Sequence, residues 1–169
     1  MSKAQPETTP TIKAELRALN GLSDSWPPAI RRIGDIITDV AKAVHLDCNL
    51  IAAVIKKETW FNPTLYPQGL KACPDGPCSG SCTSHRGAVG PMQVMPYHFT
   101  ADERGREMQT NIRTGSEILR DYINRKGGVR EGLAAYYCGP NRGTYTADCW
   151  AYADSILEWY EESARTSRN

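Results

Sequence analysis

Three segments of the chain repeat apolar residues every three or four positions, which is the spacing of one face of an α-helix. They are residues 30–46, 111–126 and 148–165. A fourth segment, residues 49–60, begins with a continuous apolar run. No stretch alternates apolar and polar residues over the length that an extensive sheet requires. The sequence therefore predicts a mainly α fold.

The chain has the length of one domain. Its 169 residues are enough to bury roughly two thirds of the unfolded surface, and we find no internal repeat. Residues 1–11 hold two prolines and three threonines without periodicity, which is typical of a mobile tail. We predict an N-terminal tail and lead-in over residues 1–29 and a single domain over residues 30–169.

Composition excludes several classes of protein. Twenty basic and nineteen acidic side chains give a net charge of +1, without the clear excess of Lys and Arg that nucleic-acid-binding proteins carry. No stretch approaches the roughly eighteen apolar residues of a transmembrane helix. The first residues also lack the apolar core of a secretory signal. We expect a monomer that binds no nucleic acid and has no transmembrane segment.

Six cysteines suggest an oxidising final location. An even count, beside prolines and glycines, favours two or three disulfides over unpaired thiols. Zinc is a further alternative, but residues 73–82 lack the paired short spacings of structural zinc sites, so we expect no metal. Cys138 and Cys149 are the best single pair, because the turn-rich segment between them would close a short loop worth roughly 3 kcal/mol. The disulfide candidates are Cys48, Cys73, Cys78, Cys82, Cys138 and Cys149.

A glutamate stands at the last turn of the helix predicted over residues 49–60. Glu58 lies on the same face as Ile51, Val54 and Ile55, because steps of three and four residues return to one side of a helix. Apolar neighbours and the negative end of the helix dipole both make the carboxyl group hold its proton more tightly. A glutamic acid that is protonated near neutral pH can act as a general acid. From this stretch alone, the alternative that Glu58 points to solvent at a frayed helix end stays open.

Four motifs follow one another along the chain. They are "ETWFNP" at 58–63, "GAVGPMQVMP" at 87–96, "NIRTGSEIL" at 111–119 and "LAAYYCGPNRG" at 133–143. In their order and approximate spacing, from about Ile30 to Glu161, the chain resembles the lytic transglycosylase family, whose members cleave peptidoglycan. The resemblance implies a mostly helical, lysozyme-like fold of the goose type.

The resemblance assigns roles to individual residues. Glu58 matches the family's sole catalytic acid and base, and Thr59 replaces the serine that follows it while keeping a hydroxyl group. Met92 and Gln93 match residues that lie over the sugar, and Ser84 matches a serine that touches it. The resemblance therefore implies that the substrate binds among these residues.

A second set of residues departs from the family pattern or supports the site. Tyr136 matches a tyrosine that hydrogen-bonds the catalytic glutamate, and Tyr137 replaces an asparagine. We include both among the substrate-binding candidates. Gly87 and Gly90 permit either a tight turn or a close approach of the backbone to the sugar. Asn111 lies in the segment that matches the helix supporting the site in this family.

The largest departure is a cysteine-containing insertion at residues 64–83, where the related enzymes use only a few residues. Because site residues stand at both ends of the insertion, it should emerge beside the active-site groove. It is either a disulfide-pinned flap that shapes the cleft or an addition that only stabilises the domain.

The resemblance implies cleavage of the β-1,4 bond between N-acetylmuramic acid and N-acetylglucosamine, with 1,6-anhydromuramoyl ends as products. The partner would be the glycan strands of peptidoglycan. No cofactor or metal is needed, because the substrate supplies the second reacting group. The alternatives are a hydrolytic muramidase on the same fold, such as a lysozyme or phage endolysin, and a non-catalytic wall-binding virion module. We expect an extracytoplasmic location: the periplasm, the cell wall or a phage virion.

Overall fold

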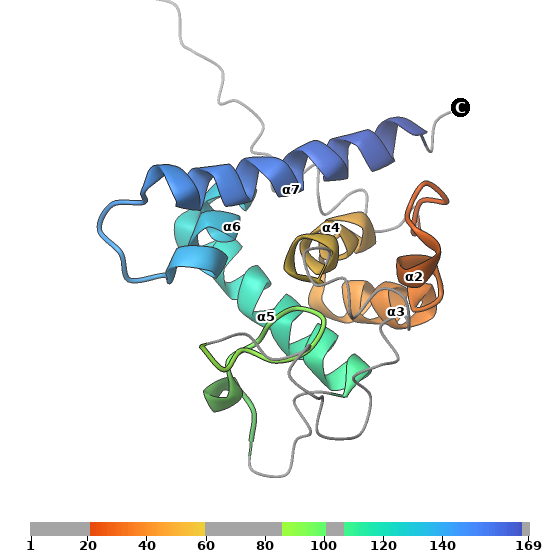
Figure 1. Cartoon of the computed structure of the whole chain (residues 1–169), viewed down its shortest axis with the longest axis horizontal. Coiled ribbons are helices and arrows are strands. Elements are labelled where there is room, and N and C mark those ends of the chain that lie inside the picture. The colour runs from red at the N-terminus through yellow and green to blue at the C-terminus, as the bar shows by residue number, and fades with distance from the viewer. Residues whose placement is uncertain (1–20, 60–85, 101–106, 167–169) are drawn as a thin grey trace, which may run out of the picture.

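The computed structural model describes residues 21–59, 86–100 and 107–166, and Figure 1 shows their arrangement. Apart from one isolated β-bridge, the regular elements of these residues are helices, so the predicted mainly α class is confirmed. None of the described helices is long and apolar enough to cross a membrane. The helices are α2 (Pro28–Arg31), α3 (Gly34–Val44), α4 (Cys48–Thr59), η3 (Pro96–His98), α5 (Met108–Lys126), α6 (Val129–Cys138) and α7 (Ala147–Thr166).

Residues 30–46 form parts of two helices instead of the single helix that the periodicity predicts. α2 ends at Arg31 and α3 begins at Gly34, and between them Ile33 leaves helical geometry at φ −107° and ψ 16°. The apolar stripe continues across this break, because Ile30 and Ile33 are as buried as the stripe of α3. Because the apolar spacing continues unchanged through the turn, the sequence pattern does not reveal the break.

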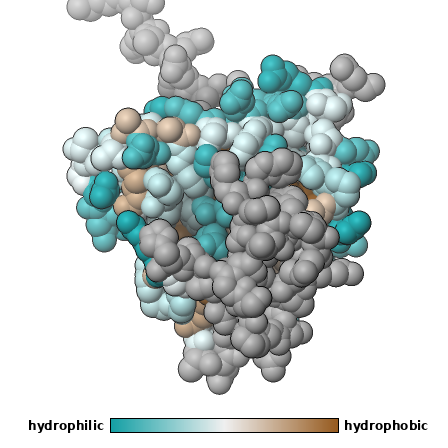
Figure 2. Space-filling model, viewed as in Figure 1, coloured by the Kyte–Doolittle hydropathy of each residue, from teal (hydrophilic) through white to brown (hydrophobic). Residues whose placement is uncertain are grey.

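Helix α4 lies at the centre of the fold. Its residues 50–55 are completely buried, and a helix that is apolar on all sides belongs in the interior. α3 and α7 pack against α4, while α5 packs against α3 and α6, and α6 also packs against α7. In Figure 1, α7 (blue) runs across α4 and α6. The surface along α7, at the top of Figure 2, is mostly hydrophilic.

Two hydrogen bonds hold α7 antiparallel to α4. Tyr160 donates to Asp47 Oδ2 at 2.8 Å, beside the start of α4. Asp47 Oδ1 accepts the backbone N–H of Asn49 at 2.8 Å and so caps the helix. Tyr152, two turns earlier in α7, donates to Glu58 in the last turn of α4. Glu58 is thereby fixed in position along α7.

The disulfide pairing of Cys138 with Cys149 is confirmed, with an S–S distance of 2.06 Å and Cα atoms 5.9 Å apart. Cys48, in contrast, is a free thiol, so its inclusion among the disulfide candidates is wrong. Its side chain is fully buried in the first turn of α4. Burial and the neighbouring Asp47 carboxylate raise the pKa of Cys48 to about 12. A buried, protonated thiol is an inert core group.

Part of the predicted organisation lies outside the described residues, namely the tail of residues 1–11 and the insertion of residues 64–83. The end of the predicted lead-in, residues 21–29, packs on the domain. There Trp26 is buried and its indole N–H donates to Asn49 Oδ1 at 2.9 Å. The domain boundary at residue 30 stays a prediction.

Candidate active site

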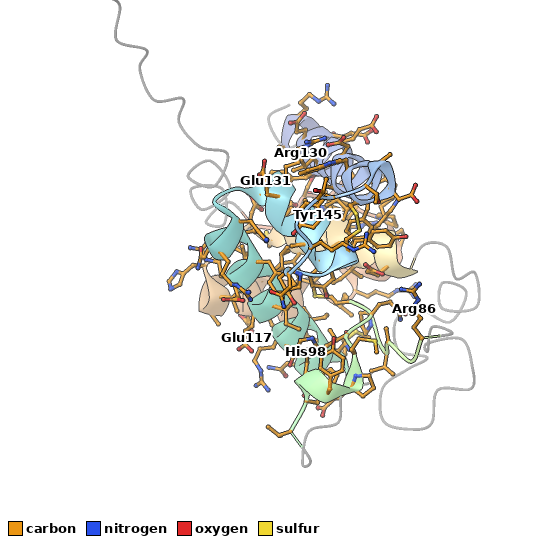
Figure 3. All side chains as sticks on the ribbon, turned by 90° about the vertical axis from the view of Figure 1, so that its left-hand side faces the viewer. Arg86, His98, Glu117, Arg130, Glu131 and Tyr145 are labelled. Atoms are coloured by element: carbon orange, nitrogen blue, oxygen red, sulfur yellow. A yellow bond between two sulfur atoms is a disulfide. The ribbon has the colours of Figure 1, made fainter. Side chains whose placement is uncertain are left out.

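A cleft of about 730 Å³ opens beside the last turn of α4, with Glu58 in its lining. Two stretches of the chain supply most of its lining, residues between Arg86 and His98 and residues between Ala135 and Asp148. Helix α5 adds two further side chains. Figure 3 shows Arg86 and His98 below the connection between α6 and α7. The cleft therefore joins parts of the chain that are far apart in sequence.

Glu58 is partly buried and reaches the cleft from the end of α4. Tyr152 donates a hydrogen bond of 2.5 Å to Glu58 Oε1. Burial raises the pKa of Glu58 to about 7, although the Tyr152 hydrogen bond and the positive charge of Lys57 act in the opposite direction. Near neutral pH the carboxyl group is divided between its two protonation states. Glu58 therefore does not point to solvent at a frayed helix end, as the alternative interpretation had it.

Tyr136 does not make the hydrogen bond that the family resemblance assigns to it. Its hydroxyl donates to the Met92 carbonyl oxygen at 2.8 Å, and a phenol has only one proton to donate. Tyr152 makes the bond to Glu58 instead. Tyr136 is nevertheless a neighbour of the glutamate. Burial and the charge of Glu58 hold the pKa of Tyr136 well above its usual value, so the phenol stays neutral.

Tyr137 stands at the rim of the cleft and is 56% exposed. Its ring stacks on the ring of Tyr152, with centroids 4.7 Å apart and planes inclined by 11°. The next residue, Cys138, is bonded to Cys149 in the first turn of α7. The disulfide therefore joins α6 to α7 beside the tyrosine that holds Glu58.

A tight loop of residues 89–94, called the cleft loop below, carries Gln93 to the cleft. Val89 and Val94 pair across its base through backbone hydrogen bonds of 2.9 and 3.0 Å. Gln93 adopts φ 50°, which is uncommon for a residue other than glycine. Its side-chain Nε2 donates to the Gly90 carbonyl oxygen at 2.9 Å. These bonds hold Gln93 in a defined position at the cleft.

Asn111 of α5 supports the cleft loop. Its fully buried amide accepts a hydrogen bond from Met92 N at 2.9 Å and donates one to the Val89 carbonyl oxygen at 2.8 Å. Gly90 has φ 75°, and a Cβ atom there would lie 2.4 Å from the Asn111 amide nitrogen. Gly87, at φ 89°, is also in the left-handed region. Both glycines thus serve the turn, and Gly90 additionally makes room for Asn111.

Met92 is fully buried, which contradicts the expectation that its side chain lies over the sugar. It packs on Gly115 of α5, where an added Cβ atom would lie 2.7 Å from the Met92 Cβ. The Ser116 hydroxyl is 3.6 Å from the Met92 sulfur. An unbranched thioether fills irregular space in a core, so Met92 anchors the cleft loop from within.

Several predicted site residues cannot be placed. Ser84, the side chain of Thr59 and the cysteines Cys73, Cys78 and Cys82 lie outside the described part of the chain. Within the residues that the structure describes, no group of three or more His, Cys, Asp or Glu side chains could hold a metal ion.

The family described as "Transglycosylase SLT domain" matches residues 35–147. The chain belongs to this family. The matched part of this SLT domain contains Glu58, the cleft loop and Tyr137, and it ends at the first residue of α7, before Tyr152.

Two relatives illustrate the match. A transglycosylase of Enterobacteria phage PRD1 is 30% identical over 118 residues, which are 68% of this chain and 37% of the phage protein. Lytic transglycosylase Slt from Pseudomonas aeruginosa, solved as an inactive glutamate-to-glutamine mutant, superposes with a TM-score of 0.56 and 18% identity. That likeness covers 92% of this chain and 30% of Slt, and it confirms the predicted fold. This SLT domain spans about a third of the length of each relative.

Sequence reasoning missed two side chains of this SLT domain. Tyr152 precedes Ile156 by four residues and Tyr160 by eight, so helical spacing already places it on the buried face of α7. That spacing could have revealed a buried phenol, although not its partner. Asp148, exposed at the start of α7, brings a second carboxylate to the cleft.

Proposed function

We propose that this SLT domain is a peptidoglycan lytic transglycosylase in which Glu58 is the only acid and base. The observation that carries the proposal is the site of Glu58, which lines the cleft with a pKa of about 7 and with Oε1 held by Tyr152. A group whose pKa is near the working pH can both give and take a proton in one reaction. The names of both relatives support the same activity.

The first step breaks the glycosidic bond. Because Tyr152 occupies Oε1, the acid proton of Glu58 is on Oε2. Glu58 donates this proton to the oxygen between N-acetylmuramic acid and N-acetylglucosamine, the bond from C1 to that oxygen breaks, and the glucosamine unit leaves as an alcohol. The muramyl 2-acetamido carbonyl supports the positive C1, so one protein carboxyl group suffices.

The second step closes the anhydro ring. The Glu58 carboxylate takes the proton of the 6-hydroxyl group on the same muramyl unit while the 6-oxygen attacks C1. Glu58 ends protonated, as it began, and no water is consumed. Tyr152 stabilises the carboxylate between the two steps, because its hydrogen bond lowers the pKa of Glu58.

Gln93 and Tyr137 bind the glycan strand in the cleft, which both of them line. Ser84 remains a prediction for the same contact. The glycan strands of peptidoglycan lie outside the cytoplasmic membrane, so the protein would act there. The relative from phage PRD1 supports a setting in which a phage opens the wall of its host.

The variant Glu58→Gln tests the proposal with purified peptidoglycan and turbidity as the readout. Its activity should fall by roughly a hundredfold or more, the usual contribution of a general acid. Glu158→Gln, which changes an exposed glutamate of α7, is the matched control and should keep wild-type activity. Undiminished activity of Glu58→Gln would overturn the catalytic assignment. A wild-type protein that binds peptidoglycan without clearing it would indicate a wall-binding module.

The location of Asp148 favours a second candidate, a hydrolytic muramidase. Most glycosidases use two carboxyl groups, and Asp148 lines the same cleft as Glu58. In that mechanism Asp148 would act on a water molecule or on C1, and Asp148→Asn would abolish cleavage. The transglycosylase mechanism instead predicts that Asp148→Asn retains activity and gives the same anhydro products.

A further inference from the structure

Two large apolar side chains stand exposed among the described residues, Tyr97 at 75% and Tyr137 at 56%. Both line the cleft, Tyr97 from η3 and Tyr137 from α6. A single exposed aromatic residue needs no explanation. Two exposed rings in one cleft, however, suit a ligand that has apolar faces of its own. Tyr137 already belongs to the site around Glu58, whereas no role has been assigned to Tyr97.

Tyr97 is held on a short, well-fixed element. Pro96 begins η3, and the backbone amides of His98 and Phe99 donate to the carbonyl oxygens of Met95 and Pro96 at 3.0 and 3.1 Å. The Tyr97 ring lies against the His98 imidazole, with centroids 4.4 Å apart and planes inclined by 40°. One side of the ring is thus supported while most of it remains open. A ring held in this way loses little rotational freedom when a ligand covers it.

Tyr97, Tyr122 and Tyr136 all line the cleft that contains Glu58. Tyr136 contacts the cleft loop through the Met92 carbonyl oxygen, whereas Tyr97 follows Val94, at the base of that loop, by three residues. Tyr97 thus lines the same cleft as Glu58 but stands on a separate element, η3.

We propose that Tyr97 is a stacking platform for a sugar of the glycan strand, one or more units away from the bond that is cleaved. A sugar ring has apolar C–H faces and a polar edge, so one face can cover an aromatic ring while the edge stays hydrated. The cleft offers such a strand two exposed rings, Tyr137, which stacks on the Tyr152 that holds Glu58, and Tyr97 on η3. The inference rests on the proposed function for the identity of the polymer, and it adds a distal subsite to it.

The test is the affinity of the full chain for N-acetylglucosamine oligomers of increasing length, measured by titration calorimetry. Tyr97→Ala should weaken the binding of long oligomers by about tenfold, because a sugar no longer covers on the order of 60 Å² of apolar ring surface. Binding of the disaccharide should not change. Tyr97→Phe is the matched control, since it keeps the ring, and it should bind every length as the wild type does. Thermal unfolding of all three proteins reports whether the fold is retained.

Several results would overturn the proposal. They are equal affinity of Tyr97→Ala and the wild type for the longest oligomers, an equal loss in Tyr97→Phe, a loss that is the same at every length, and no binding by the wild type. A different result would show that the proposed function itself is wrong. In that case binding would depend on Tyr97 as described, but the wild type would release nothing from peptidoglycan.

Discussion

Replacing Glu58 by glutamine should stabilise the protein at neutral and alkaline pH. The pKa of Glu58 is about 7 in the folded chain, because burial raises it from the ordinary 4.5. Between these two values the folded state binds more protons than the unfolded state, so the free energy of unfolding falls as the pH rises. The interval corresponds to about 3 kcal/mol, at about 1.4 kcal/mol for each pKa unit. Glutamine carries no charge and can still accept the hydrogen bond from Tyr152.

Urea unfolding of the wild type and Glu58→Gln from about pH 4 to about pH 8 measures this difference. The two proteins should be equally stable at the acid end, and the variant should gain about 3 kcal/mol at the alkaline end. Glu158→Gln, on the exposed side of α7, should follow the wild type throughout. A difference that does not vary with pH, or a variant that is less stable at pH 8, would refute the reasoning that the Glu58 carboxylate is poorly solvated.

Three further predictions concern groups that hold the site. Tyr152→Phe removes the donor that lowers the pKa of Glu58, so the pH–activity profile should move to higher pH and kcat/KM should fall by about tenfold; an unmoved profile would contradict this. Serine at both Cys138 and Cys149 should lower the free energy of unfolding by about 3 kcal/mol in denaturant titrations, from the separation of 11 residues, whereas an unchanged midpoint would contradict it. Asn111→Ala removes two buried hydrogen bonds to the cleft loop and should cost about 2 kcal/mol; wild-type stability and activity would show that the loop does not depend on Asn111.

The helices could be predicted because each buries a stripe whose spacing is visible locally. The buried residues 50–55 and the stripe of α5 are examples. The break at Ile33 could not be predicted, because the stripe stays in phase across it. The three residues of η3 are too few to show a helical period. Local patterns therefore gave the elements, and tertiary packing decided where short elements begin and end.

In the candidate site, too, local features could be predicted from the sequence and tertiary contacts could not. The face of Glu58 is set by residues three and four positions away, so its apolar surroundings were predictable. Its partner Tyr152 is 94 residues further along, and the two bonds of Asn111 span 19 and 22 residues. Such contacts depend on how the helices pack. Met92 was assigned wrongly because a motif resemblance carries residue types but not the direction in which each side chain points.

In the proposed reaction Glu58 serves first as the acid and then as the base, and no water is consumed. The most direct measurement is the mass of the muropeptides that the wild type releases from peptidoglycan in heavy-oxygen water. If the 6-hydroxyl group attacks C1, the wild type releases anhydro products with the same mass as in ordinary water, and Glu58→Gln releases none. Heavy oxygen at the new muramic ends would contradict this mechanism, because it would mean that water attacks C1 in place of the 6-hydroxyl group.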